Sequence, residues 1–206
     1  MSLWAIVPIK PLRRGKSRLS EILSEDQRYQ LNHQLFTNTI NILKQVATIS
    51  DILVVSRDSD VLTEAREMEV RTVTENGTPE LNNALRRASV FSTAFSTEGV
   101  LIVPADLPLL EPDDVKDFLS ARTQAPMVLI SPDRRRQGTN MLLIEPADLL
   151  TFSFGYDSFN THCSLALSKD ADLIVIENDH IALDLDNPED YDRLKTLKSV
   201  PVLTNS

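Results

Sequence analysis

The feature that most constrains this chain is a regular alternation, over roughly its first 120 residues, of short apolar runs and longer segments with helical spacing. The apolar runs are expected to form strands at 4–9, 52–56, 70–74 and 100–103. Apolar residues recur at helical spacing in the other segments, at about 25–47, 61–68, 79–95 and 112–121. Strand, helix, strand order implies right-handed crossovers, so we predict an α/β fold built as a three-layer αβα sandwich.

The second half of the chain alternates less regularly. Strands are expected at 127–131, 140–145, 173–177 and 181–185, and helices at 156–168 and 188–197. No internal repeat, low-complexity tract or linker divides the sequence. We therefore expect a single domain over 1–206 with a mixed, mostly parallel central sheet.

Composition and cysteine content exclude several classes of protein. The chain has 206 residues, of which 42% are apolar and 25% charged, unlike a disordered, collagenous or disulfide-stapled chain. Cys163 is the only cysteine, so no internal disulfide forms and a reducing, cytoplasmic location is expected. No apolar run reaches the length of a membrane span, and the first ten residues resemble neither a signal peptide nor a transit peptide.

The formal net charge of −9 hides a strong asymmetry along the chain. The first 20 residues hold 5 basic side chains and no acid, whereas the remaining 186 hold 16 basic and 30 acidic ones, which makes that part −14. A block of like charges indicates an anionic ligand among its side chains. One basic loop on an acidic body is unlike the extended basic face that nucleic acids require, so a nucleic-acid partner is excluded.

All five of these basic residues lie in the loop after the first expected strand: Lys10, Arg13, Arg14, Lys16 and Arg18. Lysines on flexible stems beside a glycine, here Gly15, suit a chain of phosphates. The spacing is not that of a Walker loop, because Gly15 is the only glycine in the loop. A solvated basic turn is the alternative interpretation.

Three aspartates are candidates for metal binding. Asp106 follows the most apolar run, and a carboxylate at the C-terminal end of a parallel strand has either Mg²⁺ or a helix terminus for a partner. Asp184 and Asp186 are two residues apart along the strand expected at 181–185, so both carboxylates would face one way and need a cation between them. For Asp186 the alternative is a cap, shared with Asn187, on the helix that begins at Pro188.

Two further segments carry polar groups that suit an anion. Four of the five glycines lie in expected loops (Gly15, Gly77, Gly138 and Gly155), where they either form turns with positive φ or allow a ligand to approach the backbone. The backbone amides of Gly155 and Ser158, at a helix start, could bind a carboxylate or a phosphate. His162 would share the helical face of Ser158, as a catalytic or as a packed structural histidine. The basic loop 133–139 holds Arg134, Arg135 and Arg136, to which we assign no role.

Six motifs resemble those of one enzyme family. They are Pro8-x-Lys10 with Lys16-Ser-Arg-Leu19, Leu81-Asn-x-Ala84, Pro104-x-Asp-Leu-Pro108, Gly138-Thr-Asn140, Phe154-Gly-x-x-Ser-Phe-x-x-His162 and Leu183-Asp-x-Asp-x-Pro-x-Asp190. Together they resemble the 2-phospho-L-lactate guanylyltransferase family of coenzyme F-420 biosynthesis, in the nucleotidyltransferase superfamily with a glycosyltransferase-A-like, Rossmann-like fold. The block at 154–162 is the most specific of the six.

The resemblance implies roles for individual positions. Its phosphate-binding and catalytic positions are Lys10 and Lys16, with Arg18 beside them at the nucleotide. Its magnesium ligands are Asp106, Asp184 and Asp186, of which Asp106 is also catalytic. The positions that bind the phosphorylated three-carbon acid are Thr139, Gly155 and Ser158. Asn82 would lie near the guanine base, and Glu80 departs from the family pattern, which often has glycine ahead of Leu-Asn.

The implied reaction transfers GMP from GTP to the phosphate of 2-phospho-L-lactate with release of pyrophosphate. Residues 1–120 would bind the nucleotide and residues 121–206 the acceptor. Phosphoenolpyruvate and 3-phosphoglycerate are alternative acceptors that the residues do not separate. A sugar-phosphate or molybdenum-cofactor nucleotidyltransferase and a non-catalytic nucleotide-binding module are further alternatives. A homodimer is possible, because the apolar tail at 200–203 could pack on a neighbour or on its own domain.

Overall fold

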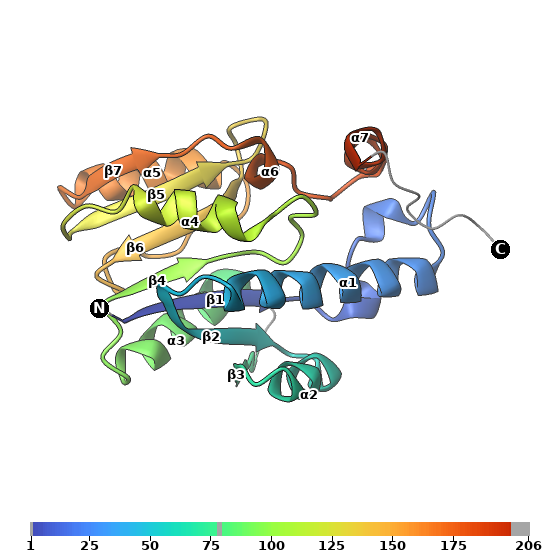
Figure 1. Ribbon diagram of the computed structural model, residues 1–206, viewed down its shortest axis with the longest axis horizontal. Helices are drawn as coiled ribbons and strands as arrows, with labels where there is room; N and C mark the ends of the chain where they lie inside the picture. The colour runs from blue at the N-terminus through green and yellow to red at the C-terminus, as the bar shows by residue number, and fades with distance from the viewer. Residues whose placement is uncertain (1, 78–79, 199–206) are drawn as a thin grey trace.

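A computed structural model describes residues 2–77 and 80–198 and contains a seven-stranded sheet in the order β3-β2-β1-β4-β6-β5-β7 (Figure 1). The strands are β1 (Leu3–Ile9), β2 (Ile49–Ser56), β3 (Arg71–Thr74), β4 (Gly99–Ile102), β5 (Met127–Pro132), β6 (Thr139–Glu145) and β7 (Asp172–Val175). Only β6 runs antiparallel to its two neighbours, and the other pairs are parallel. The predicted mixed, mostly parallel sheet is confirmed.

Helices cover both faces of this sheet. They are α1 (Glu25–Lys44), α2 (Ser59–Glu67), α3 (Leu81–Thr93), α4 (Pro112–Ser120), α5 (Ser158–Ser168), α6 (Asp179–Ala182) and α7 (Pro188–Lys198), with 3₁₀ turns η1 (Leu12–Arg14) and η2 (Ser17–Leu19). Alternate residues of β1 point to opposite faces: Ala5 packs in the core beneath α1, α2 and α4, whereas Ile6 packs in the core beneath α3 and α5. Figure 1 shows α1 and α4 in front of the sheet and α3 behind it. The predicted three-layer αβα sandwich is therefore confirmed.

A third apolar cluster joins segments that are far apart in the sequence. It connects η2 and α1 to the chain around α7 and consists of Leu19, Leu23, Leu31, Leu35, Leu185, Tyr191 and Leu194. The burial of these side chains holds the segment around Leu185 against the basic loop. The N-terminal loop and the C-terminal acidic segment thus lie on one side of the molecule.

The strand predicted at 181–185 is wrong. Asn178 instead caps the short helix α6, since its Oδ1 accepts hydrogen bonds from the backbone N–H of His180 and Ile181 at 2.8 and 3.1 Å. The chain after α6 is extended but lies outside the sheet. Leu185 is buried there, and its backbone N–H donates to the Asp106 carbonyl at 3.0 Å. Leu183 and Leu185 are buried and alternate with the partly exposed Asp184 and Asp186, although this segment pairs with no strand in the part of the chain that the structure describes.

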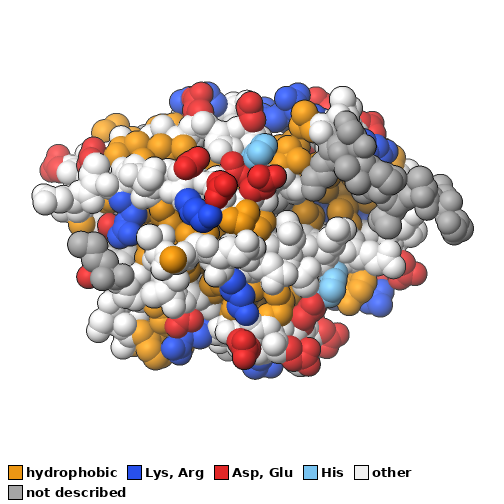
Figure 2. Space-filling view, in the orientation of Figure 1, with side chains coloured by type: hydrophobic (Ala, Val, Ile, Leu, Met, Phe, Trp, Pro, Cys, Tyr) orange, Lys and Arg blue, Asp and Glu red, His pale blue; other side chains and the backbone are white. Residues whose placement is uncertain are grey.

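The parallel strands bring their C-terminal ends to one edge of the sheet. β1 and β4 are hydrogen-bonded neighbours, and in Figure 1 their ends point toward the side where η1, η2 and α7 lie. On the face that Figure 2 shows, the described basic side chains stand beside acidic ones and form no continuous stripe. Among the described residues, no helix combines the length and the hydropathy that a membrane crossing requires. The apolar tail at 200–203 lies outside the described residues.

Candidate active site

A cavity of about 580 Å³ opens at the C-terminal ends of β1 and β4. Its walls come from the loop after β1, the loop after β4, the start of β6, the loop before α5 and the extended segment before α7. Eight of the residues with predicted roles line it: Lys10, Lys16, Asp106, Thr139, Gly155, Ser158, Asp184 and Asp186. Segments separated by more than a hundred residues therefore meet in one site.

Lys16 lies at the centre of the charged side of this cavity. Its Nζ donates to Asp106 Oδ2 at 3.0 Å and to Asp186 Oδ1 at 3.2 Å, and only 8% of the side chain is exposed. Burial by itself lowers the pKa of Lys16, but the two carboxylates outweigh burial and hold that pKa above its ordinary value. Lys16 is therefore a fixed ammonium that bridges two acidic segments.

Asp184 lies near Asp106 and Asp186, but the hydrogen bonds of Lys16 go to those two carboxylates and not to Asp184. Burial, together with the nearby charges of Asp106 and Asp186, raises its pKa to about 6. Three carboxylates around one ammonium leave the cluster with an excess of negative charge. A cation beside Asp184 would relieve both the repulsion and the cost of burial.

The donor set of these aspartates suits magnesium, because Mg²⁺ takes oxygen ligands and usually combines one or two carboxylates with phosphate oxygens and water. Within residues 2–77 and 80–198, no three His, Cys, Asp or Glu side chains are grouped closely enough to enclose a metal ion. The aspartates therefore fit an ion that is shared with a bound polyphosphate, rather than one caged by protein alone. Such an ion would supply charge neutralisation at the phosphates.

The loop that carries the two lysines is fastened to α1 through Asn32. Asn32 Nδ2 donates to the Leu12 carbonyl at 2.7 Å and lies 2.6 Å from where a Cβ on Gly15 would stand. Gly15 has a φ of −69°, so the expectation of a positive φ is wrong at this position. A side chain at this position would displace the Asn32 amide from Leu12, and the left-handed residue of the loop is Lys16, with a φ of 54°.

The structure separates the five basic residues of this loop. Lys10 and Arg14 line the cavity with Lys16, and no ion pair of Lys10 is found among the described residues. Arg18 is 75% exposed and approaches Asp186 only to 3.9 Å, outside the lining of the cavity. Arg13 instead faces Glu25 and Asp26 on α1. Three of the five basic residues therefore line the cavity, and the other two lie outside its lining.

The opposite wall is polar and largely uncharged. Thr139 begins β6, Ser158 begins α5, and Gly155 lies between the two segments with a φ of 130°, which a side chain would strain. The Ser158 N–H donates to the Gly155 carbonyl at 3.3 Å, so this amide closes a turn and is not the free anion donor that we predicted. Asp133 and Asn140 also line this part of the cavity.

Asn82 does not line the cavity. Its side chain clasps the backbone of Phe154, donating to the Phe154 carbonyl at 3.1 Å and accepting from the Phe154 N–H at 2.6 Å. Phe154 does line the cavity, so Asn82 shapes the wall from behind. The three arginines of the loop 133–139 also lie outside the lining: Arg134 and Arg135 face Glu189, and Arg136 pairs with Glu177.

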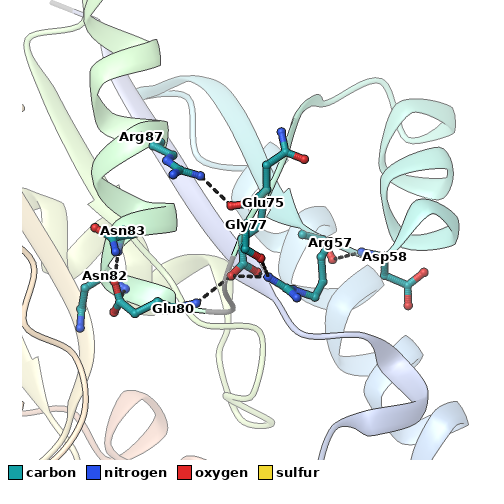
Figure 3. A network of polar contacts seen from close by, with 10 residues as sticks. Arg57, Asp58, Glu75, Gly77, Glu80, Asn82, Asn83 and Arg87 are labelled. Carbon is teal, nitrogen blue, oxygen red and sulfur yellow. Dashed lines mark hydrogen bonds and ion pairs between the residues drawn. The ribbon is translucent and has the colours of Figure 1, made fainter.

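Sequence reasoning missed a second polar network at one end of the cavity (Figure 3). Arg57 donates from Nε and Nη2 to the Glu75 carboxylate, both at 3.3 Å, and Glu75 Oε1 accepts from the Glu80 N–H at 3.0 Å. Arg57 follows β2 directly and Glu75 follows β3 directly, so the rule that found Asp106 beyond β4 could have found both.

Glu80 has a local role. Its carboxylate accepts from the backbone N–H groups of Asn82 and Asn83 at 2.9 and 2.7 Å, and so caps α3. The capping carboxylate also occupies the N-terminus of α3, where an anion would otherwise be attracted. Asn187 likewise caps α7, with its Oδ1 accepting from the Asp190 N–H at 3.1 Å, which leaves the Asp186 carboxylate to Lys16.

Several known proteins are similar to this chain in sequence. Residues 3–196 match the family model described as "Guanylyl transferase CofC like". A phosphoenolpyruvate guanylyltransferase of Rubrobacter xylanophilus is 40% identical over 195 residues, which covers 95% of this chain and 94% of that protein. A 2-phospho-L-lactate guanylyltransferase of Methanocaldococcus vulcanius is 31% identical over 186 residues, with 90% and 80% covered.

The fold has a counterpart among solved structures. A nucleotidyl transferase from Methanothermobacter thermautotroptrophicus superposes with a TM-score of 0.69 at 16% identity, which covers 96% of this chain and 99% of that one. The likeness confirms the expected nucleotidyltransferase fold. Together with the match over nearly the whole sequence, it shows that this chain belongs to the CofC-like guanylyl transferase family, a family of nucleotidyltransferases.

Proposed function

We propose that this enzyme transfers GMP from GTP to the phosphate of a phosphorylated three-carbon acid and releases pyrophosphate. The observation that carries the proposal is the cavity itself, which joins a basic loop, three aspartates and an uncharged polar wall. The basic loop suits a polyphosphate and the aspartates suit its metal ion, whereas the uncharged polar wall suits a small acid. The pairing of these chemistries in about 580 Å³ matches two substrates that must meet.

On the nucleotide side, Lys10 and Lys16 would hold the phosphates. Lys16 is already oriented by two carboxylates, so it adds a cation whose position costs little to fix when substrate binds. Lys10 is exposed at the rim and is free to follow the polyphosphate. Asp106, Asp184 and Asp186 would hold Mg²⁺ together with phosphate oxygens, and the metal would neutralise charge that develops at the α-phosphate and the leaving group.

On the acceptor side, the side chains of Thr139 and Ser158 and the backbone of Gly155 would bind the three-carbon acid. The attacking group is its phosphate, which is largely a dianion at pH 7 because the second pKa of a phosphate monoester lies near 6. A dianion attacks phosphorus in line without a general base. The chain's own residues therefore position the two substrates and neutralise charge, and no proton-abstracting residue is required.

Phosphoenolpyruvate is the first candidate acceptor, because the relative that carries its name is 40% identical to this chain. The relative named for 2-phospho-L-lactate, which was our expectation from the motifs, is 31% identical. The two acids differ by a double bond and share the phosphate and the carboxylate, so the polar wall suits either. A role in coenzyme F-420 biosynthesis follows from either acceptor through the family resemblance.

The test is an acceptor screen with pyrophosphate release as the readout. GTP and ATP are each mixed with Mg²⁺ and with phosphoenolpyruvate, 2-phospho-L-lactate or 3-phosphoglycerate, with EDTA in place of Mg²⁺ as the control. We expect release with GTP that requires both metal and an acid, and most release with phosphoenolpyruvate. GTP binding without release in any mixture would instead favour the non-catalytic nucleotide-binding module.

A further inference from the structure

His162 is buried directly behind the polar wall of the cavity. Its exposed fraction is 0%, and its ring packs edge-on against Phe154 with 4.9 Å between ring centroids. The Thr139 hydroxyl lies 3.0 Å from Nδ1, and the backbone N–H of Ser153 lies 3.0 Å from Nε2. One ring therefore connects α5 to the first residue of β6 and to the loop before α5, although it does not line the cavity itself.

These two contacts fix the tautomer of the ring. A backbone N–H can only donate, so Nε2 must accept the hydrogen bond from Ser153 and carries no proton. Burial lowers the pKa of His162 to about 4, so the ring is neutral near pH 7. A neutral ring with a bare Nε2 holds its proton on Nδ1, and Nδ1–H must therefore donate to Thr139 Oγ1.

The direction of this bond decides what the threonine can do. Thr139 Oγ1 accepts from His162, which leaves the hydroxyl proton to be donated elsewhere. Among the described residues, no other side chain or carbonyl forms a hydrogen bond with this hydroxyl, and Thr139 lines the cavity. A buried hydroxyl proton without a protein acceptor is stabilised by an oxygen supplied from the cavity.

We infer that His162 is a positioning residue, which turns the Thr139 hydroxyl into a fixed donor for a carboxylate or phosphate oxygen of the acceptor acid. The inference rests on the proposed function, because it presumes an anionic acceptor at the polar wall. His162 does not exchange a proton with substrate. It would increase the affinity for the acceptor, because a hydroxyl that is already held in the donating orientation loses less rotational freedom when the anion binds.

The tautomer can be measured without any substrate. The chain has three histidines, so ¹⁵N labelling and long-range ¹H–¹⁵N correlation give three ring systems, and the spectrum of a His162 variant identifies the one of interest. We expect the wild-type protein at pH 7 to show His162 protonated on Nδ1 and bare on Nε2. A proton on Nε2, or a doubly protonated ring, would overturn the inference whatever the enzyme's activity.

Two substitutions separate positioning from packing. In His162→Asn the amide nitrogen reaches the level of Nδ1 and can still donate to Thr139, whereas in His162→Gln the amide oxygen reaches the level of Nε2 and can only replace the contact with Ser153. Each variant keeps one hydrogen bond and loses one. We expect the acceptor KM to rise roughly tenfold or more in His162→Gln, with a much smaller rise in His162→Asn and the KM for GTP little changed in both.

A double variant tests whether His162 acts through the threonine. Thr139→Val removes the hydroxyl at nearly constant volume and should raise the acceptor KM at least as much as His162→Gln does. Adding His162→Gln to Thr139→Val should then raise it no further. Thr39→Val is the matched control, since it removes an equally buried hydroxyl, bonded to the Leu35 carbonyl at 2.9 Å, away from the cavity.

The outcomes distinguish this inference from the proposed function. Equal effects of the two His162 variants on the acceptor KM, or additive effects in the double variant, would reduce His162 to a packing residue while leaving guanylyl transfer intact. Wild-type protein that transfers GMP to none of the three acids would instead refute the proposed function. In that case the tautomer measurement still decides the orientation of the hydroxyl, and a result other than Nδ1–H refutes the inference as well.

Discussion

At the scale of single residues, the charged side of the cavity depends on Asp106. Its carboxylate accepts a hydrogen bond from the buried ammonium of Lys16 at 3.0 Å and is one of the three proposed metal ligands. We expect Asp106→Asn to lose on the order of a hundredfold or more in kcat, because the orientation of Lys16 and the binding of the proposed Mg²⁺ would both depend on that charge. Turnover close to wild type at saturating Mg²⁺, from a variant with an unchanged circular dichroism spectrum, would refute the assignment.

The Asp184 carboxylate destabilises the folded protein, because its raised pKa means that the fold disfavours its charged form. Asp184→Asn removes a buried negative charge from beside Asp106 and Asp186. We expect the variant to be more stable than wild type by about 1–3 kcal/mol at pH 7.5 in EDTA, and to be nearly inactive. Urea unfolding of both proteins measures this, and a variant of equal or lower stability would contradict the charge-repulsion account.

The lowered pKa of His162 predicts that the folded protein loses stability as the pH falls below 6.5. Its pKa falls from 6.5 in the unfolded chain to about 4 in the fold, so the unfolded chain binds the extra proton between these values. The contribution to stability is complete above about pH 6.5 and is lost as the pH falls toward 4. Between pH 7 and 4.5, wild type should lose roughly 2 kcal/mol more than His162→Asn in urea unfolding. Parallel losses in the two proteins would contradict the burial of a neutral ring.

At the scale of elements, loops at one edge of the sheet build the site, and two of them are held by contacts between residues far apart in the sequence. The contact of Asn32 with Leu12 fixes the loop after β1, and the clasp of Asn82 on Phe154 fixes the loop before α5. Helical periodicity placed both asparagines on helices but says nothing of their long-range partners. The predicted strand at 181–185 failed for a different, local reason, because the cap at Asn178 begins a helix where apolar alternation had indicated a strand.

Gly15→Ala tests the fastening of the lysine loop. The new methyl group would meet Asn32 Nδ2 and break its bond to the Leu12 carbonyl, so we expect a loss of about 1 kcal/mol in stability and a severalfold rise in the KM for GTP. In an Asn32→Ala background, where the clash is absent, Gly15→Ala should change the KM for GTP no further. Additive effects in the double variant would show that Gly15 acts by some route other than Asn32.

At the scale of the whole molecule, the sequence was sufficient to predict the layers, the mixed sheet and eight of the residues that line the cavity. Periodicity predicted the layers and the sheet, whereas the charge block and the rule that parallel strands end at one edge pointed to the lysines and to Asp106. Thr139 was predicted only from the family resemblance. The sequence was not sufficient for Arg18 and Asn82, whose neighbours in space come from the extended segment before α7 and from the loop before α5. The charge asymmetry between the first 20 residues and the rest of the chain appears in the structure as a short-range contact, in which Lys16 bridges Asp106 and Asp186.

The most direct test of the central claim identifies the bond that forms. ³¹P NMR of the enzyme with GTP, Mg²⁺ and phosphoenolpyruvate should show pyrophosphate together with two coupled resonances of a new phosphoanhydride, which joins GMP to the phosphate of the acid. The same mixture with Asp106→Asn should stay nearly unchanged over the same time. Pyrophosphate with free GMP, or no new phosphoanhydride with any of the three acids, would contradict guanylyl transfer as the function of this site.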